Sequence, residues 1–146
     1  MDPELIFTIS GRLVMPAWLL LIFLPRWKWT EKLVFYVWIP SIIAVFYIYL
    51  MSTALPFSEG AGFGSVKAVM NLFTIPAVAA AGWIHYLAFD LFVGAWEVRD
   101  AQRRNVNHLL VVPCLMLTLM AGPAGLLLYF VIRYLFVREL STVETA

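Results

Sequence analysis

The sequence predicts an all-α, polytopic membrane protein built as a bundle of about four transmembrane helices. Of its 146 residues, 63% are hydrophobic and only 13% are charged, and the core of a soluble domain of this size cannot bury so much apolar surface. The apolar residues also fall into long runs, each close to or above the roughly 20 residues that a helix needs to cross a bilayer. We therefore expect a single transmembrane domain over residues 1–146.

The expected spans cover residues 5–24, 33–55, 73–98 and 109–137. Pro40 lies inside the second span and predicts a kink there, because a proline within a helix removes one backbone hydrogen bond. Between the second and third spans, residues 56–71 contain closely spaced glycines together with Glu59 and Lys67. This composition is typical of a surface loop followed by a short interfacial helix.

Basic residues predict the orientation of the bundle. The connectors after the first and third spans carry Arg26, Lys28, Lys32, Arg99, Arg103 and Arg104. The opposite side carries Lys67, Arg133 and Arg138. By the positive-inside rule we expect both termini to lie outside. Because Asp2 and Glu4 stand where a secretory signal is basic, we expect the first span to be retained in a bacterial inner membrane.

Three ionisable residues inside the expected spans are the candidate catalytic groups: Arg12, His85 and Asp90. Such side chains cost ~2.5–3.5 kcal/mol in lipid, so each is expected to face the bundle interior and find a partner. At ~1.5 Å per residue, Arg12 lies ~20 Å from the basic side and His85 lies ~18 Å from it. The same count brings Tyr47 and Gly122-Pro123 to this depth, which predicts a polar layer near the bilayer midplane.

Helical periodicity divides the residues of the third span between two faces. At 100° per residue, one stripe of about 80° holds aromatic, small and acidic residues, namely Trp83, Tyr86, Asp90, Gly94 and Glu97. His85 lies roughly 140° from Asp90, so the two could share only a wide cavity. On the fourth span, Pro123 deprives the carbonyl of Leu119 of its helical partner, as Pro16 does for Arg12 on the first.

Purely structural roles stay open for these residues. Arg12 could hold the bundle together by pairing with Asp90 or with a free carbonyl. His85 could be a packing residue, and Asp90 could cap a helix or reach the interface. Tyr47 and Gly122-Pro123 could serve only packing and bending.

Residue counts exclude several kinds of site. Two histidines and one cysteine without a His-x-x-x-His pattern cannot build a usual zinc or two-metal site. His108 at the membrane surface cannot share one haem with the deeply placed His85, although a single pigment macrocycle on His85 stays open. We expect no metal and no cofactor, and a net charge of +1 offers no basic excess for nucleic acid.

The stretch 83–92 reads Trp-Ile-His-Tyr-Leu-Ala-Phe-Asp-Leu-Phe and is followed by Asp100, His108 and a Gly122-Pro123-x-Gly125 turn. These motifs resemble the small membrane-protein family of the plant abscisic-acid-deficient-four protein, whose plant members are needed for neoxanthin synthesis. The resemblance covers most of the chain. Its most specific parts are the Trp-Ile-His and Asp-Leu-Phe triplets and the Gly-Pro-x-Gly turn.

The resemblance implies a carotenoid step in which an epoxide of violaxanthin opens to an allene without net redox change. Such an isomerisation needs a proton donor at the epoxide oxygen and a base for a proton beside the polyene. Carried over, Asp90 or Arg12 would act on the acid side and His85 would be the base.

The same resemblance, together with the aromatic stripe, indicates where the substrate would bind. A long apolar molecule would lie along Trp83 and Tyr86 and face Tyr47. Gly122 and Pro123 would let this molecule or a neighbouring backbone approach closely.

Two functions are kept open. The first is a carotenoid- or isoprenoid-handling membrane protein, with a non-redox isomerase as its enzymatic form. The alternative is a non-catalytic accessory subunit of a larger membrane assembly, such as a pigment-bearing photosynthetic complex. The expected partners are accordingly a carotenoid or another isoprenoid lipid, the membrane, and a pigment-protein complex or further copies of the chain.

Overall fold

The computed structural model describes residues 1–138, and all its regular elements in that range are helical. In chain order they are α1 (Pro3–Phe23), α2 (Lys28–Thr30), the π-helical turn η1 (Glu31–Phe35), α3 (Trp38–Thr53), α4 (Val66–Phe73), α5 (Pro76–Arg103) and α6 (His108–Val137). Four stretches are long and apolar enough to cross a membrane, namely Pro3–Phe23, Lys28–Thr53, Pro76–Arg103 and His108–Val137. The all-α membrane fold is confirmed.

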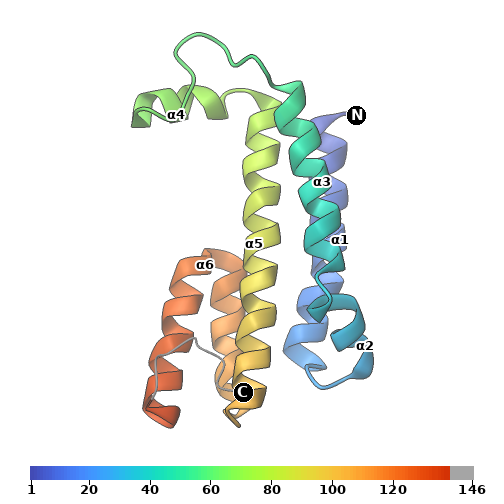
Figure 1. Ribbon diagram of the computed structural model, residues 1–146, viewed down its shortest axis with the longest axis vertical. Helices are drawn as coiled ribbons and strands as arrows, with labels where there is room; N and C mark the ends of the chain where they lie inside the picture. The colour runs from blue at the N-terminus through green and yellow to red at the C-terminus, as the bar shows by residue number, and fades with distance from the viewer. Residues whose placement is uncertain (139–146) are drawn as a thin grey trace.

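Helix α5 is the centre of the bundle and contacts α1, α3, α4 and α6 (Figure 1). Helices α1 and α3 pack beside it along its length. Close packing with α1 depends on Gly94, because a Cβ there would lie 2.7 Å from the ring of the fully buried Trp18. Small residues allow such approach where no hydrophobic effect drives helices together inside lipid.

The second apolar run is interrupted before Pro40 rather than at it. Val37 adopts a left-handed conformation with φ of 53°, and α3 begins directly afterwards at Trp38. Pro40 therefore falls in the first turn of α3, where its missing N–H leaves no helical hydrogen bond unmade. The predicted kink is thus a break between η1 and α3.

Helix α4 lies across one end of the bundle, crosswise to the long helix α5 (Figure 1). It begins at Ser65, whose side chain accepts a hydrogen bond from the backbone N–H of Ala68 at 3.1 Å. The apolar side chains of Val66, Met70 and Phe73 are all exposed. A short amphipathic helix in this position matches the expected interfacial segment between the second and third apolar runs.

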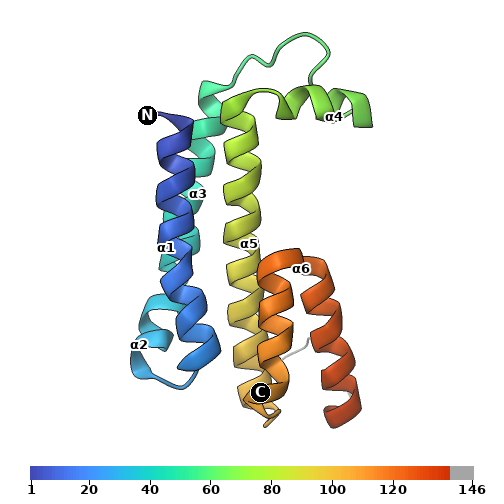
Figure 2. The same cartoon turned by 180° about the vertical axis from the view of Figure 1, so that it is seen from behind.

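The last apolar run is a helical hairpin and not one straight helix. Ala121 has non-helical angles (φ −154°, ψ 63°), and the chain reverses there, so that the two arms of α6 run side by side (Figure 2). Gly122 and Pro123 follow the reversal, where a proline cannot continue the N–H ladder. At 1.5 Å per residue the first arm, before Ala121, is about 20 Å long and the second, after it, is about 24 Å long, so both are shorter than the ~30 Å apolar core of a bilayer. The expected crossing over residues 109–137 is corrected accordingly.

Because α6 is a hairpin, its end and Met1 lie at opposite ends of the bundle. Arg133 in the second arm pairs with Asp100 near the end of α5, so the end of α6 returns to the level at which α6 begins. Met1 lies at the other end of the bundle, where its amino group bonds to the hydroxyl of Tyr49 in α3 (Figure 2). The expectation that both termini share one side rested on four full crossings, and the C-terminal residues themselves lie outside those described.

Closure of the hairpin should depend on Gly125. A Cβ at this position would lie 2.5 Å from the Cα of Thr118 in the other arm, and a backbone atom cannot move aside as a side chain can. Gly125→Ala is expected to destabilise the protein by about 1–3 kcal/mol, measured as a lower melting temperature in detergent.

The matched control is Gly11→Ala in α1, where a Cβ would meet no atom within 4 Å. This variant should melt at or slightly above the wild-type temperature, because alanine is favoured over glycine within a helix by about 0.5–1 kcal/mol. Equal melting temperatures for the Gly125 variant and the wild type would contradict the hairpin.

Candidate functional site

A groove of about 1100 Å³ opens beside the upper half of α5, where the α6 hairpin ends and α4 lies across. Its walls come from α1, α4, α5 and the hairpin tip: Met15, Phe73, Ala79, Gly82, Trp83, Tyr86, Leu87 and residues 119–124. Apart from the hydroxyl of Tyr86 and the indole N–H of Trp83, these side chains carry no polar group. The site is an apolar groove with few polar groups, the usual composition of a small-molecule pocket.

Aromatic side chains shape the wall on α5. The ring of Trp83 stacks on Tyr86 with a centroid distance of 5.8 Å and also contacts Phe7 of α1 at 5.6 Å. The hydroxyl of Tyr86 donates to the carbonyl of Leu119 at 3.5 Å. This is the carbonyl that Pro123 was predicted to leave without a helical partner. Tyr86 is thereby held at the hairpin tip with its ring in the groove.

Asp90 lies under the hairpin tip, one turn from Tyr86. Its side chain is only 8% exposed and packs directly on Gly122, where a Cβ would come within 2.9 Å of the carboxyl carbon. The phenol of Tyr86 is its polar neighbour. Within the described chain, Oδ2 of Asp90 has no hydrogen-bond partner. A buried carboxyl oxygen without a partner is costly, so this one calls for an explanation.

A second acidic group follows two turns further along α5. Glu97 is fully buried and accepts a hydrogen bond from the hydroxyl of Thr118 in α6 at 3.0 Å. Its other oxygen, Oε2, is unpartnered among residues 1–138. The sequence placed Glu97 on the same stripe as Asp90 but gave no reason to assign it a partner, because Thr118 reaches it only through the hairpin.

The polar stripe ends in an ion-paired cluster around Asp100. Tyr129 donates its hydroxyl hydrogen bond to Oδ2 at 2.7 Å, and Arg133 lies 3.4 Å from the same oxygen. Arg104 approaches Oδ1 at 3.0 Å. Since Arg133 is fully buried, this cluster ties the second arm of the hairpin to the end of α5. The sequence had assigned Arg133 to the opposite side of the membrane.

His85 lies on another face of α5 and does not line the groove. Its ring stacks on Phe89 at 4.5 Å and contacts Tyr47 of α3 at 5.6 Å. Tyr47 and His85 are therefore neighbours, at one depth as predicted. The side chain of His85 points toward α3, however, whereas that of Asp90 points toward α6. The ~140° between the two positions on the helix is the reason.

Arg12 contacts neither the acidic side chains of α5 nor the His85–Tyr47 pair. Its side chain is exposed on α1, and it forms no hydrogen bond or ion pair with any residue that the structure describes. The nearest groove-lining residue in sequence is Met15, about one turn further on. Pairing of Arg12 with Asp90, which the sequence left open, is not present.

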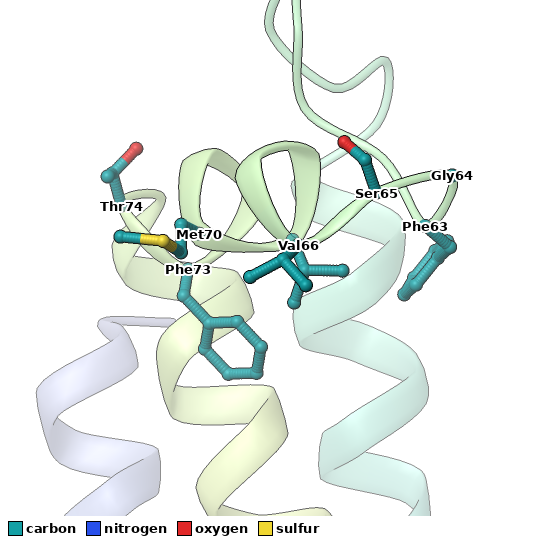
Figure 3. A pocket seen from close by; sticks show the side chains of 8 residues that line it. Phe63, Gly64, Ser65, Val66, Met70, Phe73 and Thr74 are labelled. Carbon is teal, nitrogen blue, oxygen red and sulfur yellow. The ribbon is translucent and has the colours of Figure 1, made fainter.

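A second cavity of about 710 Å³ lies under α4 and shares one wall residue, Phe73, with the groove. Figure 3 shows the ring of Phe73 directed away from α4 toward the long helices, with the hydroxyls of Ser65 and Thr74 pointing the other way. Gly82 makes room for this ring, because a Cβ there would lie 2.6 Å from it. Phe73 therefore separates the inner groove from the apolar underside of α4.

Among residues 1–138, no three His, Cys, Asp or Glu side chains are grouped so that they could hold a metal ion. Tyr86 lines the groove, and its neighbour Asp90 lies behind the groove-lining Gly122, so a phenol and a carboxyl stand side by side at the border of an apolar space. Such a pair can bind an oxygen atom of a ligand and exchange a proton with it.

Comparison with known proteins supports one family. Residues 5–129 match the family model described as ABA DEFICIENT 4-like, which covers most of the chain. No curated protein and no solved structure matches the chain.

The ion pairs of Asp100 should be required for stability. Asp100→Asn removes the carboxylate that faces buried Arg133, and breaking a buried pair from one side costs about 3–5 kcal/mol. We expect a large fall in the melting temperature in detergent.

Tyr129→Phe is the matched control, because it deletes only the 2.7 Å hydrogen bond and keeps the ion pairs. Its expected cost is about 1.5–3 kcal/mol, because the lost hydrogen bond goes to a charged group. The cluster would not be the anchor of the hairpin if this variant lost as much stability as Asp100→Asn.

Proposed function

Because the chain belongs to the ABA DEFICIENT 4-like family, we propose that it is a carotenoid- or isoprenoid-handling integral membrane protein that binds its ligand in the groove beside α5. The family relates to carotenoid (neoxanthin) formation. The observation that carries the proposal is the apolar groove of about 1100 Å³ with the Tyr86–Asp90 pair at its edge.

The groove suits a long apolar molecule that carries an oxygen near one end. Trp83 and Phe73 offer flat apolar walls, and the groove lies at the level of the apolar helices, so a ligand would enter it from the lipid. The oxygen would reach Asp90 and Tyr86 at the hairpin tip. The predicted binding residues Trp83, Tyr86, Gly122 and Pro123 all line this space.

As an isomerase, the protein would need to move a proton without changing the redox state of its ligand. Asp90 would give a proton to the ligand oxygen, and the proton released from carbon would return to the same carboxylate, so that none is gained or lost overall. Tyr86 would orient the oxygen by a hydrogen bond. His85, expected as the base, faces α3, and this proposal gives it no role in the groove.

The hairpin supports a revised orientation in a bacterial inner membrane. It returns Arg133 and Arg138 to the end of the bundle that already holds the basic connectors after α1 and α5. This strengthens the basic excess at that end and leaves Lys67 near α4 on the other side. By the positive-inside rule, the basic end would face the cytoplasm, with Met1 and α4 outside.

Ligand binding can be tested on the purified protein. The wild type should retain a carotenoid or another isoprenoid from membranes that contain one, detected by extraction and absorbance. Asp90→Asn and Tyr86→Phe should weaken binding of a hydroxylated carotenoid by roughly 10-fold or more, because Tyr86→Phe removes a hydrogen bond to the ligand oxygen and Asp90→Asn replaces a carboxyl group by a weaker amide partner.

His85→Ala is the control on the same helix, and its binding should equal that of the wild type. A wild-type protein without bound or saturable isoprenoid would refute the proposed function. A loss in His85→Ala as large as that in Asp90→Asn would show instead that the ligand lies on the α3 side.

Orientation can be tested with single cysteines. In a Cys114→Ala background, Ser58→Cys in the loop before α4 should react in intact cells with a maleimide that cannot cross membranes. Lys28→Cys should react only in inverted vesicles. The reverse pattern would contradict the orientation.

A further inference from the structure

Arg12 occupies an unusual place, halfway along a membrane-spanning helix. At 1.5 Å per residue, it lies about 13 Å from Pro3 and about 16 Å from Phe23, the two ends of α1. An arginine side chain reaches about 6 Å along a helix toward an interface. The guanidinium therefore cannot reach lipid phosphates at either surface.

The side chain also points away from the bundle. Leu5 and Leu19 stand seven residues before and after Arg12, within about 20° of it around the helix, and they are 49% and 56% exposed. The buried face of α1, with Ile6, Val14 and Leu21, lies on the other side. Arg12 is thus a cation on an outer surface whose other side chains are apolar except for Thr8, one turn before it.

Nothing in the described chain neutralises it. Arg12 has no hydrogen bond and no ion pair within residues 1–138. The three carboxylates of α5, on Asp90, Glu97 and Asp100, are buried, and Glu4 lies at the far end of α1, about two turns from Arg12. A charged group in hydrocarbon is stabilised by a partner or by water, and no described residue supplies a partner for Arg12.

The surface next to Arg12 suits a helix. Gly11 lies about 100° from Arg12 around the helix, at the border between the outer and the buried face of α1, and a Cβ there would meet no atom within 4 Å. Glycine and other small residues let a neighbouring transmembrane helix approach closely, and a polar side chain beside them can then pair across the contact.

We propose that the outer face of α1 that holds Leu5, Arg12 and Leu19 binds a transmembrane helix of a different protein that carries an aspartate or glutamate at the depth of Arg12. We favour a different protein over a second copy, because residues 1–138 of a copy would offer no exposed carboxylate at mid-membrane. The proposal is independent of the groove and its ligand. It supplies an attachment surface for the larger assembly that the sequence left open as an alternative.

The test places a photoreactive amino acid at Leu19 in the full-length protein, expressed in the organism that supplies the gene. Illumination of its membranes should give a protein adduct, whose partner is identified by mass spectrometry. The same probe at Ile48, which is 65% exposed on α3, is the control and should give lipid adducts only. In Arg12→Met the adduct should fall at least ten-fold, whereas Arg12→Lys should keep it.

A charge exchange completes the test. Neutralising the partner's membrane carboxylate should abolish the adduct, and Arg12→Glu combined with arginine at that partner position should restore it. Arg12→Met must keep the wild-type melting temperature, so that loss of the adduct reports on the contact. Adducts to lipid alone, adducts to a second copy, or an adduct that survives Arg12→Met would each overturn the proposal.

Discussion

The α6 hairpin is held against α5 by carboxyl groups, and the rest of the site depends on this attachment. Asp100 binds Tyr129 and Arg133 of the second arm, and Glu97 accepts from Thr118 of the first. Within lipid there is little hydrophobic gain in pressing one apolar helix on another, so hydrogen bonds and close packing decide which helices associate. The acidic side chains of α5 thereby fix where the two arms of α6 pack, although most side chains of α6 are apolar.

The groove is a consequence of where that hairpin ends. Each arm is too short to cover the whole of α5, and the tip stops beside Asp90 and Gly122. Above the tip, the wall of α5 with Trp83 and Tyr86 stays uncovered by any described helix until α4 crosses it at Phe73. A full-length fourth span would have filled this space, and no groove of this size would exist.

The same geometry separates residues that share a depth. Counting along the helices correctly brought Tyr47 and His85 into contact, because depth follows from the rise per residue. Depth does not fix direction, however, and α5 presents Asp90 to α6 and His85 to α3. Arg12 was expected to point inward because a charge in lipid needs a partner, yet it lies on the outer face of α1. The physical rule holds if the partner is supplied by another molecule.

Composition and periodicity alone determined that the chain is a helical membrane protein, where its apolar runs lie, that a short interfacial helix precedes α5, and which residues of α5 share a polar stripe. These features are local, because each depends on the apolar length of a segment or on the 100° step of a helix. Only the tertiary structure decided that residues 109–137 double back at Ala121. A uniformly apolar run looks the same whether it forms one long helix or two short ones. The choice rests on contacts between residues distant in sequence, such as Asp100 with Arg133 and Asp90 with Gly122.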